Sequence, residues 1–125
     1  IRLVYRTREK AERLARSVGG NFRLTEWNKK EQALCEAELL ANATTLGMNG
    51  FDPLEIDLTN LSETAVVADL VYAPLKTELL KQAEQKGCRT ADGLGMLLHQ
   101  ARPAFQAWFG VMPEITPELR EMALK

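Results

Sequence analysis

Two hydrophobic periodicities alternate along the chain of 125 residues. Short runs of aliphatic, β-branched and aromatic residues predict strands, and apolar positions three and four apart predict helices. The expected strands cover residues 1–5, 22–25, 38–43, 65–72 and 88–91. The expected helices cover residues 7–18, 29–37, 75–86 and 94–101, with a last short helix starting at Thr116-Pro117. Strands separated by helices need crossover connections, so the pattern predicts one α/β domain with a mostly parallel sheet and flanking helices.

Two stretches break this alternation. Residues 44–61 contain Gly47, Gly50 and Pro53, and we expect a loop there with at most short helical turns. Pro103 removes one backbone donor from an otherwise helical stretch. The helix therefore either kinks at this proline or a new helix starts with Pro103 in its first turn.

Charge and composition exclude several kinds of partner. Sixteen Lys and Arg face 17 Asp and Glu, for a net charge of -1, whereas a nucleic-acid binder normally carries a basic surplus. No apolar run approaches the ~20 residues that a membrane-spanning helix needs. Two cysteines and one histidine provide neither a disulfide framework nor a zinc ligand set. We therefore expect a cytoplasmic globular domain that binds neither nucleic acid nor membrane nor metal.

The first residues raise a question about domain boundaries. The chain opens at Ile1 and enters an apolar stretch at once, whereas native chains usually begin with a few loose polar residues. A dinucleotide fold needs a Gly-rich turn after its first strand, and the Gly93-Leu94-Gly95 segment lacks a third glycine and lies too late in the chain. We expect residues 1–5 to be the second strand of such a fold, with the first strand and its loop upstream. The alternative is a trimmed chain that lacks nothing important.

Candidate binding chemistry lies where the first strand ends, because ligands of open parallel sheets bind beyond the carboxyl ends of the strands. No acidic residue follows this strand until Glu9, and Arg6 and Arg8 flank Thr7. A fold that prefers NAD places an acid here for the ribose 2′-hydroxyl, whereas a fold that prefers NADP offers Arg to the 2′-phosphate. In a dinucleotide fold, this pattern fits a 2′-phosphate better than a 2′-hydroxyl. The alternative is a set of ordinary solvated charges at a helix start.

Two further elements present unusual residues. Along the strand 65–72, Leu70 and Tyr72 point to the same side, because strand side chains alternate with period two. In the helix that follows residue 92, Gly93, Met96 and Gln100 share one face. Gln100 is the hydrogen-bonding side chain of that stripe and offers both donors and an acceptor.

Several segments in collinear order carry a family resemblance. Residues 42–48 match Asn-Ala-Thr-x-x-Gly-Met, and residues 69–80 match Asp-x-x-Tyr-x-Pro-x-x-Thr-x-Leu-Leu. Residues 92–110 begin with Asp-Gly-Leu-Gly-Met-Leu and continue through His-Gln-Ala to Trp-Phe-Gly. Together these segments resemble the shikimate dehydrogenases, in which Asn-Arg-Thr usually stands where this chain has residues 5–7, Tyr-Arg-Thr.

The resemblance implies a Rossmann-like NADP domain and NADPH-dependent reduction of 3-dehydroshikimate to shikimate, a step of aromatic amino-acid biosynthesis. It assigns nine residues to two ligands. The cofactor residues are Arg6 and Thr7 at the 2′-phosphate, Asn42, Ala43 and Thr44 along the cofactor, and Leu70 and Gly93 at the nicotinamide end. The residues implied to reach the substrate are Tyr72 and Gln100.

The resemblance also implies what these residues lack. The catalytic Lys and Asp of the family belong to an N-terminal substrate domain, so residues 1–125 are expected to form a partial NADP domain without turnover. The sheet edge left by a missing strand predicts poor stability or self-association. Two alternatives stay open: a quinate or shikimate dehydrogenase that prefers NAD, and a non-catalytic nucleotide-binding relative.

Overall fold

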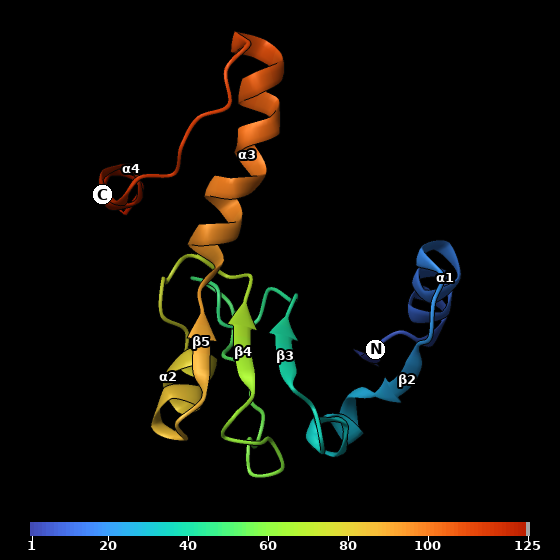
Figure 1. The fold of residues 1–125 in the computed structure, drawn as a ribbon. Coiled ribbons are helices and arrows are strands. Elements are labelled where there is room, and N and C mark those ends of the chain that lie inside the picture. The colour runs from blue at the N-terminus through green and yellow to red at the C-terminus, as the bar shows by residue number, and fades with distance from the viewer. Residues whose placement is uncertain (125) are drawn as a thin grey trace.

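The computed structural model describes residues 1–124, which form two small parallel sheets (Figure 1). One sheet pairs β1 (Arg2–Tyr5) with β2 (Arg23–Glu26). The other has the strand order β3–β4–β5 and contains β3 (Leu39–Asn42), β4 (Val66–Asp69) and β5 (Arg89–Ala91). All strand pairings are parallel, as the alternation of strands and helices predicted.

The helices connect and follow these strands. α1 (Arg8–Val18) joins β1 to β2, and α2 (Glu78–Gln85) joins β4 to β5. A 3₁₀ helix, η1 (Trp27–Leu34), leads from the first sheet to the second. α3 (Gly93–Phe109) follows β5 and rises away from the carboxyl end of the sheet, and α4 (Pro117–Met122) lies near the end of the chain (Figure 1).

The single sheet expected from the sequence is divided in two. Among residues 1–124, β1 pairs only with β2 and β3 pairs only with β4, so each keeps one unpaired edge. Figure 1 shows β2 and α1 standing apart from β3, β4 and β5. The Arg2 side chain donates to the carbonyl oxygens of Ala33 and Cys35 and so ties β1 to the end of η1.

Other expectations are corrected in detail. The helix expected over 29–37 is instead the 3₁₀ helix η1, which is kinked at Lys29 by a non-helical φ of -116°. The strand expected to be buried at 38–43 is mostly exposed, with Leu39 at 60%, because Leu40 on its other face is the side chain that packs against the core cluster. Pro103 lies inside α3, which continues through it as one helix. This stretch is exposed, so water can satisfy the carbonyl group that loses its partner.

The hydrophobic core covers one face of the three-stranded sheet. α2 contributes Leu79, Leu80 and Ala83 to this core, and β4 contributes Val67. The loop between β3 and β4 has no helix, as expected, and it adds Leu54, Leu58 and Leu61 to the same cluster. Within residues 1–124, no helix has both the length and the apolar character needed to cross a membrane.

Candidate functional site

A buried polar network joins the carboxyl ends of β3 and β4. Asp69 is 2% exposed, and its carboxylate accepts hydrogen bonds from Asn42 Nδ2 at 3.0 Å and Thr77 Oγ1 at 2.7 Å. The backbone N–H of Val71 adds a third donor at 3.0 Å. A buried carboxylate without such partners would be costly, so these donors explain how Asp69 is accommodated.

Asn42 also shapes the loop that follows β3. Its Oδ1 accepts from Thr44 N at 3.0 Å and from Thr44 Oγ1 at 2.8 Å, while its Nδ2 also donates to Leu46 O at 3.1 Å. The side chain is 3% exposed and its polar atoms are engaged within the chain. Ala43 and Thr44, by contrast, are exposed at this edge of the sheet. Asn42 therefore holds the loop, and its neighbours form the accessible surface.

Leu70 and Tyr72 project from the carboxyl end of β4. They are 36% and 49% exposed, whereas Val71 between them is 5% exposed. Strand-like alternation thus continues past Asp69, although the sheet ladder ends there. Leu70 and Tyr72 share the exposed side, as the sequence predicted.

Gly93, the first residue of α3, packs directly on this strand end. Its N–H donates to the carbonyl oxygen of Val71 at 3.3 Å. A β-carbon at this position would lie 2.3 Å from the carbonyl oxygen of Leu70, which is an impossible contact. The absence of a side chain therefore lets the α3 N-terminus approach the β4 backbone closely.

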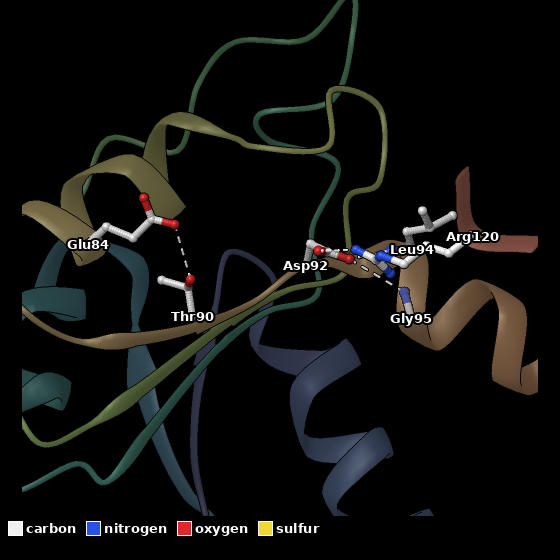
Figure 2. A network of polar contacts seen from close by, with 6 residues as sticks. All are labelled: Glu84, Thr90, Asp92, Leu94, Gly95 and Arg120. Carbon is white, nitrogen blue, oxygen red and sulfur yellow. Dashed lines mark hydrogen bonds and ion pairs between the residues drawn. The ribbon is translucent and has the colours of Figure 1, made fainter. Parts of the chain in front are cut away.

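Asp92 caps α3 and connects it to α4 (Figure 2). Its Oδ1 accepts from the N–H groups of Leu94 at 3.1 Å and Gly95 at 3.4 Å. Its Oδ2 forms an ion pair with the Arg120 guanidinium of α4. The sequence reasoning assigned no role to Asp92, although Asp before a glycine-rich apolar run is a helix-start signal. Figure 2 also shows Thr90 of β5 donating to Glu84 of α2 at 3.2 Å.

Gln100 lies about two turns along α3, the helix that rises from the carboxyl end of the sheet. It is exposed, as is Tyr72. Neither side chain makes a hydrogen bond to any residue from 1 to 124. Both polar groups are therefore accessible from solvent on the carboxyl side of the β3–β4–β5 sheet.

Arg6 and Thr7 occupy a second place, at the end of β1. The Arg6 guanidinium carbon lies 4.6 Å from the ring centroid of Trp27 and has no ion pair or hydrogen bond to the rest of residues 1–124. Thr7 is the N-cap residue of α1, as predicted, but its side chain makes no capping hydrogen bond. The donors of Arg6 and the hydroxyl of Thr7 are thus available at this end of the helix.

Arg8 behaves differently from Arg6. Its Nε donates to Glu12 Oε1 at 2.8 Å, one turn along α1. The hydrogen bond raises the pKa of Arg8 and lowers the pKa of Glu12 below its usual range. The charge of Arg8 is therefore already compensated.

An open cavity of about 410 Å³ lies beside Arg6. Its lining residues come from the ends of β1 and β2 and the starts of α1 and η1: Tyr5, Arg6, Arg8, Glu26, Trp27 and Asn28. The sequence reasoning missed Trp27. The available signal was its position two residues after the strand predicted at 22–25, at the same end of the sheet as Arg6.

The structure therefore divides the expected site residues into two groups. Those following β3, β4 and β5 gather at one edge: Asn42, Ala43, Thr44, Leu70, Tyr72 and Gly93. Arg6 and Thr7 lie on the other sheet, across the unpaired edges of β1 and β3. Gln100 lies on α3, two turns beyond Gly93 of the first group.

Parallel strands, crossover helices and polar residues at the strands' carboxyl ends define a Rossmann-like α/β domain. The family model of the shikimate 5′-dehydrogenase C-terminal domain matches residues 93–117. A shikimate dehydrogenase (NADP(+)) of Dinoroseobacter shibae is 51% identical over 124 residues, which are 99% of this chain and 45% of that protein. One of Nitrobacter hamburgensis is 52% identical over 98% of this chain and 43% of its own length. Over nearly its whole length the chain is thus similar to these shikimate dehydrogenases, and it spans less than half of their length.

Solved structures agree with this relationship. Quinate dehydrogenase from Corynebacterium glutamicum in complex with NAD aligns with a TM-score of 0.86 and 31% identity, over 98% of this chain and 45% of that one. Shikimate 5-dehydrogenase from Thermus thermophilus in complex with NADP(H) and shikimate gives a TM-score of 0.76 and 32% identity, over 98% of this chain and 44% of that one. The alignments extend over both sheets of the chain.

Proposed function

We propose that residues 1–125 form the NADP-binding part of a cytoplasmic shikimate dehydrogenase, which reduces 3-dehydroshikimate to shikimate with NADPH. The observation that carries this proposal is the 51% identity to a shikimate dehydrogenase (NADP(+)) along 99% of the chain. Cys35 and Cys88 are free thiols, which fits a reducing compartment.

The donor set at the end of β1 fits the adenosine 2′-phosphate. Arg6 offers a planar array of N–H donors with no partner within residues 1–124. Thr7 adds a hydroxyl that does not cap its own helix, and the first backbone N–H groups of α1 point the same way. A phosphate at a helix N-terminus is also favoured by the helix dipole.

The edge formed by β3 and β4 fits the other half of the cofactor. Ala43 and Thr44 border the cofactor on a loop held by the buried Asn42. Leu70 provides an apolar surface for the nicotinamide, and Gly93 lets the α3 N-terminus pack against the Leu70 backbone beside it. NADPH, when bound, supplies the hydride for the reduction.

Tyr72 and Gln100 are assigned to the substrate. A phenolic hydroxyl and a carboxamide supply both donors and acceptors, which suit a hydroxylated carboxylic acid. Both side chains are exposed on the carboxyl side of the sheet, where a substrate domain would face them. The chain contributes no catalytic residue in this proposal, and alone it should show no turnover.

The proposal includes the parts that complete the site. A strand between β1 and β3 would pair with both free edges and join the two sheets, as in a complete Rossmann-like fold. Phe105, Trp108 and Phe109 of α3 are 39%, 77% and 64% exposed, and an apolar surface of this kind supports docking of a substrate domain.

One rival is a quinate dehydrogenase that prefers NAD. The TM-score of 0.86 with such a protein in complex with NAD favours it. Against it stand Arg6 and the absence of an acid between Tyr5 and Glu9, because an NAD-preferring site uses an acid at the strand end to hold the 2′-hydroxyl.

A chimera tests the proposal. This chain replaces the matching 45% of the Dinoroseobacter shibae protein, and the product is assayed with 3-dehydroshikimate and either NADPH or NADH. We expect activity with NADPH, at least tenfold weaker activity with NADH, and none from the chain alone. A folded chimera without activity would contradict the proposed reaction, and one that works better with NADH and quinate would establish the rival.

A further inference from the structure

We propose that Trp27 is a positioning residue that holds the Arg6 guanidinium for the 2′-phosphate and so sets the preference for a 2′-phosphorylated nucleotide. This inference rests on the proposed function. It concerns a residue for which neither the motifs nor the family resemblance gave a role.

Arg6 and Trp27 are brought together by backbone pairing. Tyr5 of β1 stands opposite Glu26 of β2 in the parallel ladder. Arg6 and Trp27 are the next residues on the two strands, so they leave the sheet side by side at its carboxyl end. The short distance between the Arg6 guanidinium and the indole follows from this register.

The indole of Trp27 is held in place by the hydrophobic core. Trp27 is half-buried and packs against the hydrophobic core cluster around Leu34 and Val67. Arg6, in contrast, is exposed and has no other polar partner within residues 1–124. The packing of Trp27 on the core therefore fixes the ring against which the exposed Arg6 guanidinium lies.

Stacking on the ring restricts Arg6 without using up its donors. The guanidinium carbon is 4.6 Å from the ring centroid, within the range of a cation–π contact. Such a contact uses the charge and the flat face of the group, and leaves its N–H edges free for phosphate oxygens. Prior restriction of a long side chain lowers the entropy lost on binding.

Arg6 differs from the other cations around the cavity because it has no acidic partner within residues 1–124. Arg8 is paired with Glu12, and Lys30, whose Nζ lies 5.8 Å from the same ring, is paired with Glu31 at 2.8 Å. The Glu26 carboxylate also lines the cavity, and Lys29 Nζ lies 3.9 Å from it. A 2′-phosphate would therefore meet Arg6 as the cation without an acidic partner, with Glu26 as the nearby group that disfavours an anion.

The test measures two dissociation constants for the full chain and its variants by isothermal titration. The probes are 2′,5′-ADP and 5′-AMP, which differ by the 2′-phosphate. We expect the wild type to bind 2′,5′-ADP at least tenfold more tightly. Arg6→Gln should abolish this preference, since a charged hydrogen bond to phosphate is lost.

Trp27 variants then separate positioning from direct contact. Trp27→Leu should reduce the 2′,5′-ADP affinity roughly 2- to 5-fold, leave 5′-AMP unchanged and have no further effect in the Arg6→Gln background. Trp27→Phe keeps a π face and should retain most of the preference. If the Leu variant does not fold, Trp27→Met supplies the same comparison with a more adaptable apolar side chain. Trp108→Phe, at the exposed end of α3, is the matched control and should leave both dissociation constants unchanged.

The outcomes distinguish this inference from the proposed function. If Arg6→Gln abolishes the preference and Trp27→Leu does not alter it, Trp27 has no positioning role and the 2′-phosphate site stands. If Trp27→Leu weakens both nucleotides equally, Trp27 contacts the base and the inference is overturned. If the wild type shows no preference, or Arg6→Gln retains it, the proposed 2′-phosphate site fails together with the inference.

Discussion

The two strand ends that carry the candidate site are built in opposite ways. At the ends of β3 and β4, Asp69, Asn42 and Thr77 are buried and bonded to one another. At the end of β1, Arg6 and Thr7 are exposed, and their side chains have no polar partner within residues 1–124. Buried polar groups that satisfy one another fix a shape, whereas exposed donors remain available to a ligand. Substitutions in the first region should therefore change stability, and those in the second should change binding.

Removing the centre of the buried network should have the largest effect. Asp69→Ala leaves the buried N–H of Val71 and the Asn42 amide without their shared acceptor. We expect the free energy of unfolding to fall by about 3 kcal/mol, measured by urea denaturation. Asp69→Asn is the control, because it keeps one acceptor oxygen and should cost less. Equal, small losses in both variants would show that the network does not hold this edge.

The contact between α3 and β4 gives the next largest effect. Gly93→Ala places a methyl group 2.3 Å from the Leu70 carbonyl oxygen, and we expect a loss of roughly 2 kcal/mol as the helix start moves away. Gly95→Ala is the matched control in the same helical turn, since nothing lies within 4 Å of its new β-carbon. It should be neutral or stabilising, because alanine favours a helix. Equal melting temperatures for the two variants would contradict this packing.

Thr77 and Thr7 are the N-cap residues of α2 and α1, so substituting each one compares how the two regions contribute to stability. Thr77 Oγ1 donates to Asp69 and accepts from the N–H of Leu80, whereas the Thr7 side chain makes no capping bond. Thr77→Ala should cost about 1.5 kcal/mol of stability and Thr7→Ala close to zero. Chemical denaturation of both variants measures the difference. A loss in Thr7→Ala as large as in Thr77→Ala would show that Thr7 stabilises α1 and is not free for a ligand.

The smallest expected loss of stability comes from substitutions at the cap of α3 (Figure 2). Asp92→Ala removes the acceptor of Leu94 and Gly95 together with the Arg120 ion pair, and should cost about 1 kcal/mol. Arg120→Met removes only the half-exposed ion pair and should cost less. Denaturation at two salt concentrations helps to separate the two contributions, because salt screens the ion pair more strongly than the capping hydrogen bonds. A salt-independent and equal loss in both variants would contradict this division.

Local sequence signals predicted most of the elements. The apolar spacing located β4 and α2, and Thr7 and Thr116 stand at predicted helix starts, whereas α2 begins at Glu78 after its cap Thr77 and not at residue 75. These features depend on residues within a few positions of one another. The division of the sheet was not predicted, because periodicity does not show which strands pair.

Candidate site residues could be named from the sequence where one residue carries the chemistry, and not where distant residues meet. Arg6 was named as a candidate from the missing acid after its strand. Its stacking on Trp27 joins positions 21 residues apart and follows from the β1–β2 register, which no local pattern encodes. Gly93 was assigned to the nicotinamide end by the family resemblance, and the structure adds that the Leu70 carbonyl already requires a glycine at this position.

The most direct test of the contrast between the two regions is a nitrogen-15 NMR titration of the chain with 2′,5′-ADP. The account predicts shift changes concentrated in the amides of residues 6–10 and the indole N–H of Trp27, with residues 42–44 and 93–95 unaffected. Changes centred on residues 42–44, or no change at residues 6–10 at saturating ligand, would contradict it.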